Sequence, residues 1–328
     1  MTTRILKAGP ARLGLLFLCI WAATDHAPAA EPRPQSVRFV YLVSADRTVR
    51  EDFRRGVETA ARDVQSWYAR QLGGPTFLLN DPVVEVAKSD KEADWFSNHR
   101  NGFNKDDWGF NNGLAEARRL VGARQGDPRF VWVIYSDGPG NKGRGGDGVT
   151  VLPEDDLLGL VGRHPEQKDV KRWIAGLGHE LGHAFGLAHP TDLVKDADAI
   201  MWLGIYGKYP DRTYLTEDDR RVLLLSPFFF RPDGQPVLAL GDAVEKYVYD
   251  GGSFAKHVIE GKPVWVESKE DGRAQFRFTE TGRDGRWIRL SDPGRGMSLR
   301  LPVAGGTCSW STDGGRTWNA LYRVRKAT

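Results

Sequence analysis

Cysteine is nearly absent from this chain, with only Cys19 and Cys308 among 328 residues. Cys19 lies in an apolar N-terminal stretch, so a chain that loses this stretch keeps one cysteine and cannot form an internal disulfide. Structural zinc sites usually hold the ion with four protein ligands rich in cysteine, and such a set is also missing. We therefore expect the fold to depend on its hydrophobic core for stability.

The sequence also has little excess charge of either sign. It carries 46 Lys and Arg residues against 43 Asp and Glu, which gives a formal net charge of +3. The two signs are interspersed along the chain, and the concentrated basic surface that phosphate binding demands is missing. We therefore expect no nucleic-acid partner.

Long apolar runs are missing as well. Leu13–Ala23 is apolar over about a dozen residues, whereas a membrane-spanning helix needs about 20. This run follows three basic residues and precedes the small-residue segment Ala27–Ala30, which is the pattern of a secretory signal peptide. We expect residues 1–30 to be this signal, with cleavage near Ala29 or Ala30. The mature protein would then be secreted or periplasmic, with no membrane span.

Three of the seven histidines lie in one short segment, HELGHAFGLAH, which starts at His179. His179 and His183 are four residues apart, so on a helix they lie one turn apart on the same face and can reach one tetrahedral ion. Glu180 is too close to both histidines to be the obvious third ligand. It is well placed, however, to take a proton from a water molecule bound to the metal.

His189 is the third candidate ligand. A continuing helix would point it away from the ion, since six residues after His183 the direction is wrong by roughly two-thirds of a turn. Gly186 allows the sharp turn that is needed, because glycine reaches positive φ at little cost and ends helices. The spacing therefore predicts a zinc site made by His179, His183 and His189.

The segment resembles the signature of the metzincins, a clan of zinc endopeptidases that includes the matrixins. That signature is H-E-x-x-H-x-x-G-x-x-H followed by a methionine turn. All of its fixed positions match here, namely His179, Glu180, His183, Gly186 and His189. Downstream, Asp198–Trp202 resembles the methionine turn, in which Met201 would form an apolar floor beneath the histidines.

The resemblance implies a matrixin-like catalytic domain that binds Zn²⁺ and cleaves a protein or peptide substrate, with Glu180 as the general base. Tyr206 and Tyr209 follow the methionine turn and are candidates to support the oxyanion; ordinary core packing is the alternative role for both. Matrixins are held latent by a propeptide cysteine. No cysteine lies between the expected cleavage point and His179, so we expect no latency of that kind.

A secreted binding protein with a vestigial metal site is the alternative function. Its C-terminal domain would then recognise a cell-surface glycan or protein. The intact Glu180 argues against this alternative, because a retired site can lose its general base without harming zinc binding.

Residues 36–231 alternate between expected strands and helices, and we expect them to form an α+β catalytic domain with a twisted mixed sheet and a zinc helix. The expected strands are Val37–Ser44, Thr76–Leu79, Val83–Val86, Phe130–Tyr135 and Val149–Leu152; the expected helices are Arg50–Gln71, Asn112–Val121, Val170–Leu187 and one capped by Thr216. By resemblance, Val149–Leu152 would be the sheet edge that lines the cleft, where a substrate peptide adds as a strand.

Gly138–Gly143 fits the pattern G-x-G-x-x-G directly after an expected strand. A dinucleotide-binding turn must open a helix, whereas here further glycines and another expected strand follow. We therefore expect no dinucleotide cofactor. The glycine-rich segment up to Gly148 is either part of the cleft or a surface connection without a role.

Residues 236–328 follow the turn-rich segment Arg231–Pro236 and change to short extended runs, which predicts a small all-β accessory domain, sandwich-like. The expected strands are Glu245–Tyr249, Pro263–Glu267, Gln275–Thr279, Trp287–Leu290 and Met297–Leu301. Ser311–Trp318 resembles the Asp-box, a hairpin turn that is usually structural. Trp265, Trp287 and Trp310 would stack on a glycan if they were exposed, and core packing is the alternative.

Overall fold

The computed structural model describes residues 35–140, 142–237, 243–259, 262–270 and 274–327. The expected signal segment, residues 1–30 with its cleavage point near Ala29 or Ala30, lies outside these residues. Within the described ranges, no helix is both long and apolar enough to cross a bilayer.

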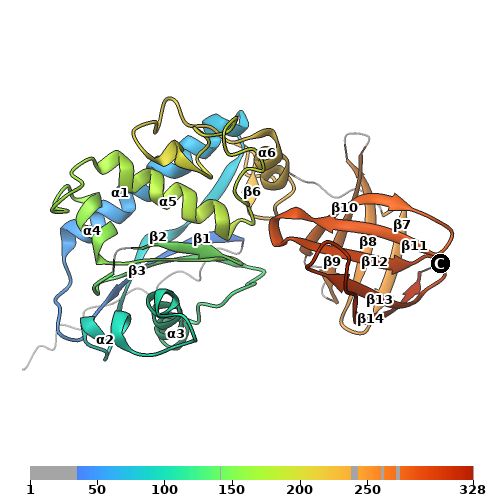
Figure 1. The fold of residues 1–328 in the computed structure, drawn as a ribbon, viewed down its shortest axis with the longest axis horizontal. Coiled ribbons are helices and arrows are strands. Elements are labelled where there is room, and N and C mark those ends of the chain that lie inside the picture. The colour runs from blue at the N-terminus through green and yellow to red at the C-terminus, as the bar shows by residue number, and fades with distance from the viewer. Residues whose placement is uncertain (1–34, 141, 238–242, 260–261, 271–273, 328) are drawn as a thin grey trace, which may run out of the picture. The chain divides into compact units, whose positions relative to one another are not determined.

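A six-stranded mixed sheet organises the N-terminal part of the chain (Figure 1). Its strands are β1 (Ser36–Val43), β2 (Thr76–Lys88), β3 (Phe130–Ser136), β4 (Arg144–Gly146), β5 (Val149–Leu152) and β6 (Phe229–Phe230), in the order β4-β5-β3-β1-β2-β6. β1, β2, β3 and β5 pair in parallel, while β4 and β6 run antiparallel to their neighbours. The two extended pieces expected within residues 76–86 are one continuous strand, β2.

The sheet ends at β4, and the expectation that Val149–Leu152 forms the edge is wrong. That segment is β5, which pairs with β3 on one side and with β4 on the other. Glycine-rich Arg144–Gly146 has low β-propensity and was not expected as a strand. It nevertheless pairs antiparallel with β5, because the chain reverses at Asp147 and Gly148, both of which have positive φ.

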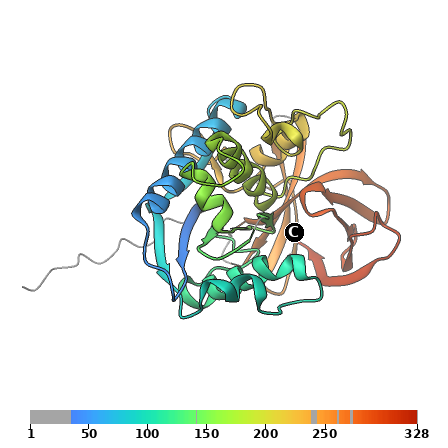
Figure 2. The ribbon, with the colours of Figure 1, turned by 60° about the vertical axis from the view of Figure 1, so that its left-hand side comes forward.

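Helices cover both faces of the sheet. α1 (Glu51–Leu72), α4 (Glu154–Leu160) and α5 (Val170–Ala184) lie on one face, and α2 (Ala93–Asn98), the 3₁₀ turn η1 (Lys105–Asp107) and α3 (Trp108–Val121) lie on the other (Figures 1 and 2). Strand β1 shows why both faces are covered. Its odd-numbered apolar residues from Val37 to Val43 join the core on the α1 and α5 side, while Val40 and Leu42 join the core on the α2 and α3 side.

The last helix before β6, α6 (Glu217–Leu224), begins at the expected residue. The Thr216 hydroxyl accepts a hydrogen bond from the Asp219 N–H over 3.2 Å, and the Asp219 carboxylate accepts one from the Thr216 N–H over 2.9 Å. This reciprocal pair is a capping box, and the expected cap at Thr216 is confirmed.

The C-terminal strands form a closed eight-stranded barrel, so the expected sandwich is wrong. They are β7 (Glu245–Tyr249), β8 (Gly252–Ile259), β9 (Lys262–Lys269), β10 (Ala274–Arg283), β11 (Trp287–Asp292), β12 (Met297–Pro302), β13 (Gly306–Ser311) and β14 (Asn319–Lys326), with the turn η3 (Pro293–Arg295) before β12. Each strand pairs antiparallel with the next, and β14 returns to pair with β7. Three strands, β8, β13 and β14, were not expected from the sequence. With all eight present, closure leaves no open edge.

One of the three tryptophans that are candidates for stacking on a glycan lies inside the barrel. Trp265 is fully buried among Tyr247, Phe278 and other apolar side chains, so for this residue the core-packing alternative holds and glycan stacking does not. Trp287 and Trp310 are half-buried. Trp265 is buried because side chains alternate between the two faces of a strand, and at this position the side chain points toward the inside of the barrel.

The Asp-box turn joins β13 to β14. The Ser311 hydroxyl accepts a hydrogen bond from the Gly315 N–H over 2.9 Å, and the Asp313 carboxylate accepts hydrogen bonds from the Arg316 and Thr317 N–H groups over 2.9 and 3.0 Å. Trp318 donates its indole N–H back to the Gly315 carbonyl over 2.9 Å. The contacts satisfy the backbone of the turn itself, as the structural interpretation predicts.

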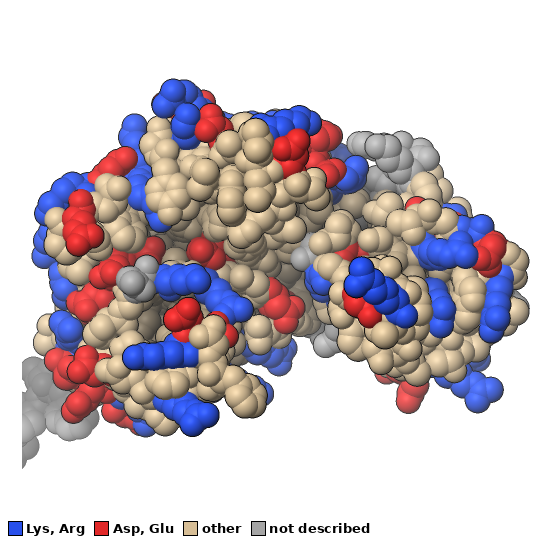
Figure 3. All heavy atoms as spheres, viewed as in Figure 1, with Lys and Arg blue, Asp and Glu red and all other residues tan. Residues whose placement is uncertain are grey.

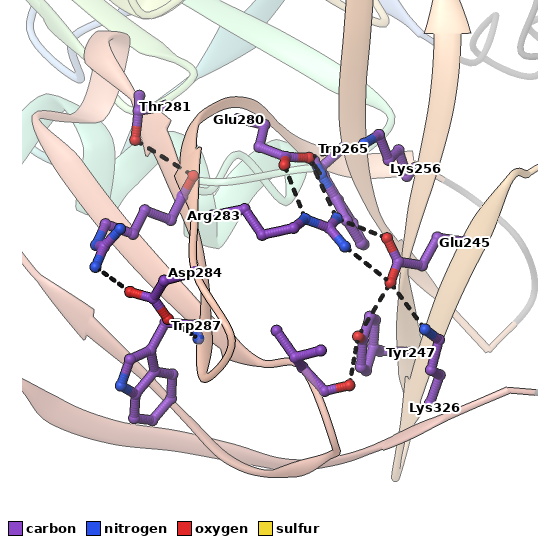
Figure 4. Close-up of polar contacts among 12 residues, drawn as sticks. Glu245, Tyr247, Lys256, Trp265, Glu280, Thr281, Arg283, Asp284, Trp287 and Lys326 are labelled. Carbon is purple, nitrogen blue, oxygen red and sulfur yellow. Dashed lines mark hydrogen bonds and ion pairs between the residues drawn. The ribbon is translucent and has the colours of Figure 1, made fainter.

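An ionic cluster ties several barrel strands together (Figure 4). Arg283 lies between two carboxylates, with its Nη2 2.6 Å from Glu245 and its Nε 3.0 Å from Glu280. Trp265 Nε1 and Lys256 Nζ also reach Glu280, over 2.8 and 3.0 Å. Burial alone would raise the pKa of Glu280, but these hydrogen bonds outweigh it and lower the pKa to about 2.

We expect Glu280→Gln to lower the free energy of unfolding at pH 7 by about 2 kcal/mol, because it leaves the buried Trp265 and the partly buried Arg283 and Lys256 without their charged acceptor. A carboxyl with a depressed pKa stabilises the fold above its unfolded pKa, and this contribution fades as the pH falls toward 2. Urea unfolding should therefore show a large difference from wild type at pH 7 and a small one at pH 3. Glu270→Gln, at an exposed barrel position, is the control. Equal effects of the two variants would contradict the role of the cluster.

Candidate metal centre

The three histidines of the motif converge. α5 places His179 and His183 one turn apart, with their Nε2 atoms 3.1 Å from each other. His189 lies beyond the end of the helix and brings its Nε2 to 3.1 Å from that of His183. The ligand atoms of the trio all lie within 4.8 Å of one another. A tetrahedral zinc ion with nitrogens at about 2.05 Å separates each pair of nitrogens by about 3.3 Å, so the trio could hold a metal ion.

Backbone carbonyls orient two of these rings. His179 Nδ1 donates to the Ile200 carbonyl over 2.7 Å, and His183 Nδ1 donates to the Leu187 carbonyl over 2.9 Å. A carbonyl oxygen can only accept, so Nδ1 carries the proton in both rings and each Nε2 presents a lone pair. Two lone pairs that face each other over 3.1 Å repel. A cation between them removes this repulsion, and metal-ligating histidines commonly donate to carbonyls in this way.

The histidines are also in the protonation state that a metal requires. Burial is the largest cause that lowers the pKa of His179; His183, His189 and Arg172 also lower it, the hydrogen bond to Ile200 opposes them, and the resulting pKa is about 4. Burial likewise lowers the pKa of His183. Both rings are therefore neutral at pH 7, as ligands must be.

Gly186 turns the chain after α5. Its N–H donates to the His183 carbonyl over 3.0 Å, and the Leu187 N–H donates to the Gly182 carbonyl over 2.9 Å. This pair of bonds is a Schellman motif, which needs a left-handed residue, and Gly186 has φ of 96°. The motif ends α5 at Ala184, so the expected extension of the helix to Leu187 is wrong. The sharp turn expected at Gly186 is present.

Met201 packs against α5. It is fully buried, and a Cβ built on Gly182 of α5 would lie 2.4 Å from its sulfur. The chain turns tightly here, with the Trp202 N–H donating to the Ala199 carbonyl over 3.0 Å. The residue before Met201 is Ile200, whose carbonyl orients His179. This short segment therefore both supports the helix and fixes one ring of the trio.

Glu180 lies half-buried beside the trio and lines the same cavities. Burial raises the pKa of its carboxyl to about 7, against the opposing effects of a hydrogen bond from the Gly145 backbone and of the charges of Lys142, Arg172 and Arg144. A pKa near neutrality suits a group that accepts and returns a proton.

Strand β4 lies directly against the backbone of α5 at Glu180. A Cβ built on Gly145 would lie 1.9 Å from the Glu180 carbonyl oxygen, far inside any permitted contact. Only glycine allows this approach. The Thr150 hydroxyl of β5 donates to the same carbonyl over 2.9 Å. The glycine-rich segment is therefore part of the site and not a surface connection without a role.

The two candidate tyrosines lie in different surroundings. Tyr206 is 55% exposed and lines the smaller of the two cavities at the trio. Tyr209 is buried, donates its hydroxyl to Asp63 of α1, and packs against Trp67 with ring centroids 5.9 Å apart. Tyr206 is thus near the histidines, while the hydroxyl of Tyr209 is already engaged within the core.

Two cavities meet at the trio. The larger, of about 700 Å³, lies between β4 and the α2–α3 side; the smaller, of about 330 Å³, lies between α5 and the segment after Met201. His179, Glu180 and His189 line both. The face in Figure 3 is hollowed between the α5 side and the α2–α3 side, and positive and negative side chains are interspersed around the hollow. An extended ligand can thus pass over the trio from one cavity into the other.

Some residues of this site escape sequence reasoning. Gly145 and Gly182 have no signature beyond being glycines, and their roles depend on which backbone or sulfur atom comes close in the fold. Arg172 and Asp156 line the smaller cavity from different helices, α5 and α4. The glycine run at 138–148 was the one available signal, and it indicated a special backbone without showing what approaches it.

No protein-family model matches the chain, and no curated protein matches it. Among solved structures, wild-type OgpA from Akkermansia muciniphila aligns with 12% identity and a TM-score of 0.40, over 94% of this chain and 99% of that one. Catalytically inactive OgpA, in complex with an O-glycopeptide substrate, aligns with 11% identity and a TM-score of 0.43, over 93% and 96% of the two chains. TM-scores below 0.5 do not establish a common fold.

Proposed function

We propose that this chain is a secreted or periplasmic zinc endopeptidase of the metzincin type. The observation that carries the proposal is the convergence of three histidine Nε2 atoms, two of them unprotonated, beside one carboxylate and above a buried methionine turn. Three histidines with an open fourth position are typical of catalytic zinc sites, whereas structural sites are closed by four ligands.

The proposal divides the chain into a signal peptide over residues 1–30, a catalytic domain over 36–231 and an accessory β-domain over 236–328. The sheet with its helices and the barrel support this division, since each has its own apolar core. The barrel would serve the enzyme as an accessory domain, with a glycan as one candidate ligand.

Substrate would bind as an extended strand along β4. This strand ends the sheet in the described part of the chain, and the end of a sheet is where an extended peptide can add as a further strand. β4 lines the larger cavity through Arg144 and Gly145, and the trio lines the same cavity. A peptide paired there would cross the histidines with its backbone fully extended.

The chain's own residues would then move the proton. When bound by His179, His183 and His189, zinc supplies Lewis acidity that polarises the peptide carbonyl and makes water acidic enough to deprotonate near neutral pH. The Glu180 carboxylate accepts the proton from water and later delivers it to the leaving amine nitrogen. Tyr206, at the rim of the smaller cavity, would donate its hydroxyl to the developing oxyanion.

Digestion of an unbiased peptide library tests the activity. We expect internal cleavages that stop when a chelator removes the metal, because the peptide carbonyl is then no longer polarised. The cleavages should return when zinc is added. His183→Ala, which removes one ligand, should behave like the chelated wild type in the same digest.

Absence of cleavage by the zinc-loaded protein would contradict the proposal. Cleavage that continues at full rate with the metal removed would contradict it equally. Binding of a surface glycan without any peptide cleavage would favour the alternative, a secreted binding protein.

A further inference from the structure

The smaller cavity at the trio has a polar lining. His179, Glu180 and His189 line it together with three further charged groups, Arg172, Lys142 and Asp156. Its volume of about 330 Å³ is at the lower end of the range for ligand pockets, roughly 300–1,000 Å³. This size suits one substrate side chain beside the bond that is cut.

Arg172 is the most distinctive group of this lining. It lies half-buried on the first turn of α5, over the ring of Tyr206 at 4.6 Å from the centroid. A Cβ built on Gly176 would lie 2.8 Å from its Nη1, so the missing side chain at Gly176 gives the guanidinium its place along the helix. Tyr206 and the space at Gly176 thus hold the guanidinium at the cavity, and neither residue carries a negative charge.

Among the described residues, nothing takes up the N–H donors of Arg172. In the described part of the chain, no carboxylate lies within 4.0 Å of its guanidinium and no acceptor takes a hydrogen bond from it. Lys142 likewise has no carboxylate within that distance among the described residues. A guanidinium offers five N–H donors in a planar fork that matches a carboxylate.

Asp156 is the one further carboxyl on this lining besides Glu180. It is buried on α4, with 7% of its surface exposed, and it does not pair with Arg172. Burial raises the pKa of Asp156 to about 7, and the charges of Glu180 and Asp155 add to this against the effect of Arg172. Two cations, Arg172 and Lys142, thus line the cavity together with two carboxyls, Asp156 and Glu180, and neither cation pairs directly with either carboxyl.

We propose that this cavity selects a substrate carboxylate next to the cleaved bond, and that Arg172 is the residue that determines this specificity. The inference rests on the proposed peptidase function and adds its substrate class. A carboxylate can come from an internal Asp or Glu side chain or from the C-terminus of a short peptide. Peptides blocked as C-terminal amides separate these two sources.

The test uses quenched fluorescent peptides that carry Glu, Gln or Lys at each position flanking the cleaved bond, as C-terminal acids and as amides. We expect wild type to cleave the best Glu peptide about tenfold more efficiently than its Gln counterpart, since a charge-assisted hydrogen bond is lost in the latter. Arg172→Glu should abolish this preference and favour the Lys peptide. Lys171→Glu, the same charge change at the exposed neighbour, should keep the wild-type preference.

Two further measurements keep the test decisive. Arg172→Lys keeps the positive charge but loses the planar set of guanidinium N–H donors, so it should keep part of the preference for Glu over Gln peptides. Such a graded loss would show that the effect of Arg172→Glu is not caused by misfolding. Binding of the Glu and Gln peptides to Glu180→Gln reports selectivity without turnover, and Arg172→Glu in that background should equalise the two dissociation constants.

Equal cleavage of Glu and Gln peptides by wild type would overturn the inference while leaving the peptidase proposal intact. A preference that survives Arg172→Glu would also overturn it. No cleavage of any peptide by the zinc-loaded protein would instead be a failure of the proposed function. Selection seen only with C-terminal acids supports the terminal carboxylate as the ligand.

Discussion

Glu180→Gln is expected to lower kcat for peptide hydrolysis by about 10²–10⁴-fold while the zinc content stays at the wild-type level. The amide keeps the shape of the carboxylate but cannot accept a proton from water. The three histidines are untouched, and their orienting bonds to the Ile200 and Leu187 carbonyls do not involve Glu180. A loss of activity with full metal occupancy therefore isolates the proton transfer.

The experiment compares steady-state cleavage and metal content in wild type, Glu180→Gln and Glu166→Gln. Glu166 is exposed and lies outside both cavities at the trio, so its substitution should leave both quantities unchanged. Wild-type turnover by Glu180→Gln would refute the role of this carboxylate. Loss of the metal would show that Glu180 helps to hold the ion.

Gly145→Ala is expected to have the second large effect, and Gly146→Ala a small one. A Cβ at Gly145 would lie 1.9 Å from the Glu180 carbonyl oxygen, whereas a Cβ at Gly146 meets no atom within 4 Å. The obstacle at Gly145 is helix backbone, which cannot rotate away as a side chain could. Overpacking of this kind typically costs about 1–3 kcal/mol of stability.

The consequence for activity should exceed the consequence for stability. If β4 moves away from α5, the edge proposed to pair with substrate shifts relative to the trio, and a misplacement of about 1 Å can cost roughly a hundredfold in rate. Urea unfolding and kcat/KM, measured on both alanine variants, separate the two effects. Similar behaviour of the two variants would show that β4 does not need its close contact with α5.

The convergence of the three histidines could be predicted because its geometry is local. Spacings of four and six residues, with one glycine between, fix where His179, His183 and His189 can point once a helix forms. The capping box at Thr216 was predictable for the same reason. For residues that are near one another in the sequence, the spacing along the chain determines how their side chains lie relative to one another.

The edge strand and the barrel depend on contacts between distant segments. Arg144–Gly146 forms a strand only because β5 and α5 lie beside it, and its glycines give no pattern of period two. The barrel closes because β14 pairs with β7, at the two ends of the domain. In short strands with weak alternation of apolar and polar residues, such as β13, the sequence pattern does not predict which strand will pair with them.

The most direct test of the account is the zinc content of the purified protein, determined by elemental analysis with the zinc absorption edge recorded on the same sample. We predict one zinc ion per chain, bound by three imidazole nitrogens, and its loss in His183→Ala. Wild-type protein with far less than one metal ion per chain, or a His183→Ala variant with unchanged zinc, would contradict the central claim.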